Sequence, residues 1–187
     1  MKNVSRLVLI VAAAAVMSAC ASSAAASNVR TPSSPSPVPT QARIATADPC
    51  ALVTASEASK AAGRTLVNSV SLGAAPVAGG CFYSAKGASA GVYVYTQVYP
   101  NAATADAVTV DQLESVMAGR IGAATGDPTQ VDGIGDKAYE FVAKGGAGNG
   151  MGIVVYRSNV VFIVAVAPTT DESTIQALAT TAVSRLH

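Results

Sequence analysis

Three cysteines, at positions 20, 50 and 81, constrain this 187-residue chain more than any other feature. An odd number of cysteines cannot all pair within one exported chain. Cys20 is set apart because it follows an apolar N-terminal segment, so Cys50 and Cys81 remain as a pair for an oxidising compartment. Two separate reduced thiols are the alternative. A zinc site is disfavoured, since two cysteines without nearby histidines cannot complete a tetrahedral shell.

The N-terminal segment has the features of an export signal. Lys2 and Arg6 supply a positive start, and residues 7–16 are ten apolar residues without a charge. Small residues follow them, as they do at secretory cleavage sites. Ten apolar residues span about 15 Å as a helix, roughly half the hydrocarbon core of a bilayer. We therefore predict a removable signal peptide over residues 1–19 rather than a membrane-spanning helix.

The end of this segment suggests a lipid anchor. Residues 16–20, Val-Met-Ser-Ala-Cys, resemble a bacterial lipobox, in which the cysteine is lipidated and becomes the mature N-terminus. Met17 stands where that motif usually has leucine. The alternative is an ordinary secretory signal with an incidental cysteine. We predict that acyl chains such as palmitate on Cys20 anchor the chain to the outer face of the cell membrane.

The rest of the chain divides into a tether and one domain. Residues 20–46 are rich in Ser, Ala and Pro, and such a stretch cannot bury enough apolar surface to fold. Residues 47–187 are predicted to form a single domain. Removal of Lys2 and Arg6 with the signal leaves 10 basic and 11 acidic residues, a net charge of −1. A near-neutral surface has no electrostatic footprint for nucleic acid.

Apolar periodicity and capping signals predict an α+β domain with a mostly antiparallel sheet and packed helices. Thr54 and Glu57 have capping-box spacing and open a predicted short helix that ends at Gly63. A second helix is expected over residues 104–119. The predicted strands are residues 81–86, 91–99, 137–143, 151–156 and 160–167. The last of these is apolar on both faces, which is typical of a central strand.

The closing helix has the clearest pattern in the chain. Apolar residues recur from Ile175 to Leu186 at helical spacing and form a single stripe. Asp171 lies near its start and Arg185 near its end, and both charges suit the helix dipole.

Several short segments carry a family resemblance: residues 48–54, Glu57, and residues 81–83, 131–139 and 154–159. Together they resemble an actinobacterial lipoprotein family of unknown function, to which LpqN-type proteins are related. The resemblance covers roughly residues 47–187. It implies a fold like that of the Mog1/PsbP group, a Cys50–Cys81 disulfide and a location in the cell envelope. The family has no general catalytic residues to transfer.

One segment formally matches a hydrolase motif. Residues 87–91 read Gly-Ala-Ser-Ala-Gly, with Ser89 as the nucleophile, and Asp132 or Asp136 and then His187 follow in triad order. A nucleophile elbow requires a helix after the serine, whereas an alternating strand follows here. A hairpin turn is therefore the favoured interpretation, and an esterase that uses Ser89 is the least favoured function. His187 is the only histidine, and we expect no enzyme, cofactor or metal site.

A stripe of tyrosines is the remaining candidate for a binding site. Tyr93, Tyr95 and Tyr99 are predicted to share one sheet face, opposite a face that carries valines. Tyrosines combine apolar area with a polar tip, so they could line a surface for a partner or a hydrophobic ligand. The alternative is that a helix packs over them. The favoured function is a non-enzymatic module that binds an envelope protein or small apolar ligand, and the next is a purely structural lipoprotein.

Overall fold

A computed structural model describes residues 42–187 of the chain, except residues 67, 75–77, 87, 89, 147 and 170. The described residues belong to one compact unit. The predicted signal peptide, Cys20, most of the predicted tether and Ser89 lie outside the described residues. No helix in the described part of the chain is long and apolar enough to cross a membrane.

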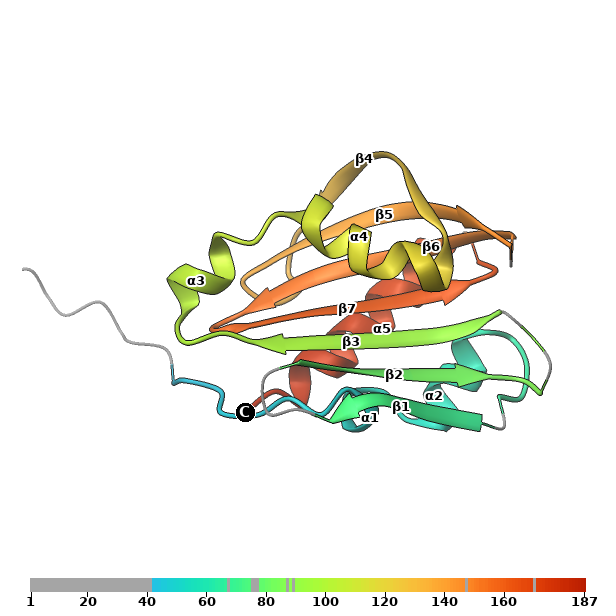
Figure 1. Cartoon of the computed structure of the whole chain (residues 1–187), viewed down its shortest axis with the longest axis horizontal. Helices are drawn as coiled ribbons and strands as arrows, with labels where there is room; N and C mark the ends of the chain where they lie inside the picture. The colour runs from blue at the N-terminus through green and yellow to red at the C-terminus, as the bar shows by residue number, and fades with distance from the viewer. Residues whose placement is uncertain are drawn as a thin grey trace, which may run out of the picture. The chain divides into compact units, whose positions relative to one another are not determined.

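The strands form one antiparallel sheet (Figure 1). Their order across the sheet is β1-β2-β3-β7-β6-β5-β4. Strand β7 lies in the middle, and all of its residues are buried, which confirms the predicted central strand. The described strands are β1 (Asn68–Ala74), β2 (Ala78–Ser84), β3 (Gly91–Val98), β4 (Ala123–Val131), β5 (Lys137–Gly145), β6 (Gly148–Arg157) and β7 (Val160–Ala167).

Helices cover both faces of the sheet (Figure 1). The described helices are α1 (Pro49–Leu52), α2 (Ala55–Ala61), α3 (Ala102–Asp106), α4 (Val110–Ile121) and α5 (Glu172–Ser184). Helices α1, α2 and α5 share one hydrophobic core with the sheet, to which Ile175 and Val164 belong. Helices α3 and α4 share the other core, which includes Met117 and Ile163. The α+β architecture with a mostly antiparallel sheet and packed helices is therefore confirmed.

Side-chain caps decide where the helices begin. The Thr54 hydroxyl accepts a hydrogen bond from the Glu57 N–H (3.3 Å), and the Glu57 carboxylate accepts one from the Thr54 N–H (2.8 Å). This is the predicted capping box of α2. Gly63 follows the end of the helix with a φ of 62°, a left-handed conformation that favours glycine.

The predicted helix over residues 104–119 is confirmed over residues 110–119, but it is wrong as a single helix, because two helices, α3 and α4, occupy this region. Thr109 has extended backbone angles and forms a second capping box with Gln112, which starts α4 at Val110. The predicted apolar stripe is present in α4, and its members Leu113 and Met117 are buried. A cap inside an apolar periodic pattern therefore separates two helices that periodicity alone joins.

Strands β1 and β4 were not predicted, and both lie at edges of the sheet. In β4 the pairing register shifts between Thr125 and Thr129, around Gly126 and Pro128. Proline at an edge strand loses no ladder hydrogen bond, so it is tolerated there. No residue of β4 is fully buried, and without a buried face a strand has no apolar alternation to read.

Residues 42–46, which the sequence assigns to the tether, lie against the domain. Ile44 is only 6% exposed and packs with Val98 and Val160. Its N–H donates to the side-chain oxygen of Asn159 (2.8 Å), and its carbonyl accepts from the Asn159 amide (2.9 Å). The Thr96 hydroxyl donates to the carbonyl of Ala47 (2.8 Å). The side chains of Asn159 and Thr96 therefore hold the backbone of the segment before α1 against the sheet.

Candidate functional site

The predicted tyrosines lie on the sheet face that α3 and α4 partly cover. Tyr93 is buried in the core that these helices share with the sheet, whereas Tyr95 and Tyr99 are half-buried at its margin. Aromatic side chains concentrate on this face of the domain. Seven of the nine aromatic residues of the chain belong to it: Phe82, Tyr93, Tyr95, Tyr99, Tyr139, Phe141 and Tyr156.

The helices cover this face unevenly. Helix α4 packs on β4 to β7 and α3 on β6 and β7, while β1, β2 and β3 have no described helix in front of them (Figure 1). On these strands Val70 lies opposite Phe82, and Phe82 lies opposite Tyr93 with ring centroids 6.4 Å apart. We call Val70, Phe82, Tyr95 and Tyr99 the aromatic face. Val70 is 49% exposed, although the other three residues are half-buried.

The hydroxyl groups of the aromatic face are neutral hydrogen-bonding groups. Burial raises the pKa of Tyr95, and burial followed by the neighbouring Tyr95 raises the pKa of Tyr99. The Tyr95 hydroxyl donates to the side-chain oxygen of Gln97 (3.2 Å). Each ring therefore offers apolar area with a polar tip, as interface tyrosines do.

The covered part of the same face is a structural core. The Tyr156 hydroxyl donates to the carbonyl of Val108, just before α4 (2.8 Å), and burial raises the pKa of Tyr156 to about 12. Tyr139 contacts the Tyr156 ring edge-on, and the ammonium group of Lys137 lies 4.1 Å from the Tyr156 ring centroid. Tyr93 is therefore buried in this core, whereas no described helix packs over the aromatic face.

A groove lies on the opposite side of the sheet, between α2 and α5. Its volume is about 320 Å³. No local sequence pattern predicts this groove, because its residues come from two helices more than 100 residues apart. The lining residues are Glu57, Lys60, Ala61, Thr174, Ala177, Leu178 and Thr181.

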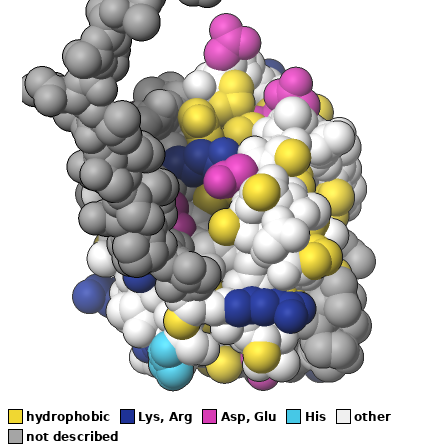
Figure 2. Space-filling view, turned by 90° about the vertical axis from the view of Figure 1, so that its left-hand side faces the viewer, with side chains coloured by type: hydrophobic (Ala, Val, Ile, Leu, Met, Phe, Trp, Pro, Cys, Tyr) yellow, Lys and Arg dark blue, Asp and Glu magenta, His cyan; other side chains and the backbone are white. Residues whose placement is uncertain are grey.

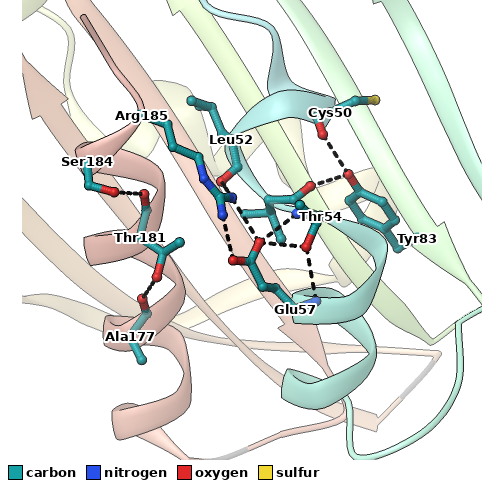
Figure 3. A network of polar contacts seen from close by, with 10 residues as sticks. Cys50, Leu52, Thr54, Glu57, Tyr83, Ala177, Thr181, Ser184 and Arg185 are labelled. Atoms are coloured by element: carbon teal, nitrogen blue, oxygen red, sulfur yellow. Dashed lines mark hydrogen bonds and ion pairs between the residues drawn. The ribbon is translucent and has the colours of Figure 1, made fainter.

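A polar network lies beside this groove and shares Glu57 with its lining (Figure 3). The Arg185 guanidinium donates to both carboxylate oxygens of Glu57 (2.8 and 2.6 Å) and to the carbonyl of Leu52 (2.7 Å). The hydrogen bond from Arg185 lowers the pKa of Glu57 from 4.5 to about 2. The Tyr83 hydroxyl lies within hydrogen-bond reach of the carbonyls of Cys50 (3.1 Å) and Val53. The network therefore joins α1, α2, α5 and β2.

The low pKa of Glu57 predicts a stability that depends on acid pH. Because the folded-state pKa lies below the unfolded value, ionised Glu57 stabilises the fold above about pH 4.5, and this contribution is lost as the pH falls towards 2. We expect Glu57→Gln to lower the free energy of unfolding at pH 7 by about 1–2 kcal/mol after allowance for solvent screening. In urea denaturation, the difference from the wild type should shrink as the pH approaches 2. The exposed Glu172→Gln is the control and should change stability little; a pH-independent effect of Glu57→Gln would contradict the prediction.

The predicted disulfide is present. Cys50 and Cys81 are bonded and join α1 to β2. Cys81 is fully buried within the core shared by α1, α2 and α5. The alternative of two reduced thiols is therefore wrong.

The residues of the formal hydrolase motif do not form a described site. Ser89 lies outside the described residues, and His187 is exposed at the end of the chain. The Asp136 carboxylate accepts hydrogen bonds from Arg157 (2.9 Å) and from the Ser158 N–H (2.6 Å), so it supports the turn between β6 and β7. In the described part of the chain, no group of three or more His, Cys, Asp or Glu residues is placed to hold a metal ion.

The end of the molecule that carries α3 is a mixed-charge surface. Figure 2 shows basic and acidic side chains next to each other, with hydrophobic side chains scattered between them. Lys137 pairs with Asp106 (3.2 Å), and Arg157 pairs with Asp136 (2.9 Å). Partly exposed pairs of this kind contribute roughly 0–1 kcal/mol each. This end therefore has no single sign of charge with which to attract a strongly charged partner.

Glu140 is a buried acid that sequence reasoning missed. It is 7% exposed on β5, facing α5, and one carboxylate oxygen has no hydrogen-bond partner. Burial raises its pKa, although a hydrogen bond with Gln176 acts in the opposite direction. A single glutamate in a strand with alternating apolar residues does not indicate, from the sequence alone, that its side chain lies on the sheet face covered by a helix.

Comparison with known proteins does not assign the chain to a family. No protein-family model matches the sequence, and no curated protein matches it. The resemblance to the actinobacterial lipoprotein family therefore stays a prediction. Among solved structures, the extracellular domain of PknH from Mycobacterium tuberculosis is similar to this chain with a TM-score of 0.46 and 14% sequence identity. The match covers 73% of this chain and 93% of that one.

Proposed function

We propose that this protein is a lipid-anchored, extracytoplasmic module without catalytic activity that binds an envelope protein through its aromatic face. The single observation that carries the proposal is the sheet face of β1, β2 and β3 that no described helix covers, on which Val70 is 49% exposed beside half-buried Phe82, Tyr95 and Tyr99. Tyrosine and phenylalanine are enriched in the cores of protein interfaces. A sheet face that carries such apolar side chains can be buried against the surface of a second protein.

The disulfide supports the proposed location. Cytosolic thiols are kept reduced, whereas exported domains retain disulfides, so the Cys50–Cys81 bond fits an extracytoplasmic compartment. The lipobox-like segment before Cys20 supports a membrane anchor. The intact mass of the protein extracted from its own membrane tests this part. An unlipidated mass would contradict the proposed anchor, but it would not test the proposed binding at the aromatic face.

Site-specific crosslinking in intact cells tests the partner. A photoreactive amino acid at Val70 should give one crosslinked product whose added mass is that of a protein. The matched position is Val142, which is 39% exposed on the face that α5 covers, and it should not give this product. Tyr95→Ser and Tyr99→Ser together should remove the Val70 product while the circular dichroism spectrum stays unchanged.

Other results would contradict the proposal in distinct ways. An added mass of a few hundred daltons would mean that the aromatic face binds a small apolar ligand. Equal products from Val70 and Val142 would mean that the contact is nonspecific. No product from either position would favour the purely structural lipoprotein.

A further inference from the structure

The groove between α2 and α5 is independent of the aromatic face, because the two features lie on opposite sides of the sheet. Its volume of about 320 Å³ is at the lower end of the roughly 300–1,000 Å³ that small-molecule sites occupy. It is open at the surface between two helices. Its occupant would therefore be small, with one side in contact with solvent.

The charges along the groove do not cancel. Glu57 is ionised, but its two carboxylate oxygens already accept hydrogen bonds from Arg185, so this pair has no net charge. Lys60 also lines the groove, one turn further along α2, and forms no ion pair with any described residue. The lining thus carries one uncompensated positive charge.

The remaining lining residues offer apolar surface rather than free donors. Ala61, Ala177 and Leu178 contribute only aliphatic atoms. The Thr174 hydroxyl donates to Asp171 (2.7 Å), and the Thr181 hydroxyl donates to the carbonyl of Ala177 (2.9 Å), as Figure 3 shows for Thr181. With both hydroxyl protons engaged inside α5, the ammonium group of Lys60 is the lining donor left for a ligand.

We infer that this groove binds a small amphipathic anion, a free medium-chain carboxylate, with its alkyl chain on Ala61, Ala177 and Leu178 and its acid group at Lys60. The alkyl chain removes apolar surface from water on both sides, which supplies most of the affinity. The charge at Lys60 fixes the orientation and selects against cationic or neutral head groups. Arg185 keeps Glu57 from repelling the anion.

Equilibrium dialysis of radiolabelled decanoate tests the inference on the full chain in phosphatidylcholine nanodiscs, with empty discs as the blank. We expect one decanoate per chain above the blank. Lys60→Gln should weaken decanoate binding roughly fivefold, the effect of one exposed opposite charge. Lys86→Gln, at an exposed lysine outside the groove, should leave it unchanged. Binding of the neutral decanol should not change in Lys60→Gln.

A second pair of variants tests the location. Ala177→Phe fills the groove and should abolish decanoate binding, whereas Ala118→Phe makes the same change at an exposed alanine of α4 and should not. Unfolding midpoints of both variants show whether each is folded. No decanoate above the blank, retained binding in folded Ala177→Phe, or equal effects of Lys60→Gln and Lys86→Gln would overturn the inference.

Two further arms separate related explanations. Loss of decanoate binding in phosphatidylglycerol nanodiscs would assign the groove to an anionic membrane lipid and overturn the proposal for a free carboxylate. Tyr95→Ser should leave decanoate binding unchanged, and Ala177→Phe should leave crosslinking from Val70 unchanged. Failure of one proposed site is thereby distinguished from failure of the other.

Discussion

Replacement of Cys50 and Cys81 together by alanine is expected to lower the free energy of unfolding by about 3–4 kcal/mol. The disulfide closes a loop with a sequence separation of 31 residues. In the chain-entropy model, a crosslink of that span removes roughly this much conformational freedom from the unfolded chain. Urea denaturation of the full chain would measure the change. The wild type unfolded with its disulfide reduced should match the double variant.

Other contacts of α1 should keep this helix in place when the disulfide is absent. The Tyr83 hydroxyl reaches the carbonyls of Cys50 and Val53, and Arg185 donates to the carbonyl of Leu52. We therefore expect the double variant to stay folded at low urea concentration. Tyr83→Phe is the comparison, because it keeps the ring and removes the hydroxyl, at a cost of about 1 kcal/mol. If the double cysteine variant lost less free energy of unfolding than Tyr83→Phe does, these hydrogen bonds alone would be sufficient to restrain α1.

Local signals account for the parts of the fold that the sequence predicted. The capping box at Thr54 and Glu57 acts within four residues, and the apolar stripe of α5 within four turns. The alternation in β3 also sorted its residues correctly, since Val92 and Val94 belong to one core and Tyr93 to the other. Each pattern is complete within one element, so no knowledge of its neighbours is required.

Long-range contacts account for most of what the sequence did not predict. Arg185 suits the end of α5, yet its guanidinium binds Glu57, 128 residues earlier in the chain. No local pattern announces such a partner. The groove beside this pair exists only because α2 and α5 pack together, and which tyrosines stay uncovered depends on where α3 and α4 dock. Of the aromatic face, the sequence therefore predicted Tyr95 and Tyr99 by residue type, whereas Val70, Phe82 and the whole groove were missed.

Asn159 illustrates the same limit at a buried polar residue. Asn159 lies in the turn between β6 and β7. The Asn159 side chain is 1% exposed, and its amide group donates to the carbonyls of Ile44 (2.9 Å) and Tyr99 (2.8 Å). Its side-chain oxygen accepts from the Ile44 N–H (2.8 Å). The Asn159 side chain therefore links the backbone at Ile44 to the backbone at Tyr99 by hydrogen bonds.

Asn159→Ala is expected to lower the free energy of unfolding by about 3 kcal/mol, because buried backbone groups of Ile44 and Tyr99 would lose their partners. Asn101→Ala, which removes an exposed cap of α3, is the control and should cost about 1 kcal/mol. Amide hydrogen exchange provides the decisive readout. Exchange at Ile44 should accelerate strongly in Asn159→Ala and remain unchanged in Asn101→Ala. If Ile44 stayed protected, its apolar contacts with Val98 and Val160 would suffice to hold the segment, and Asn159 would contribute only to its own turn.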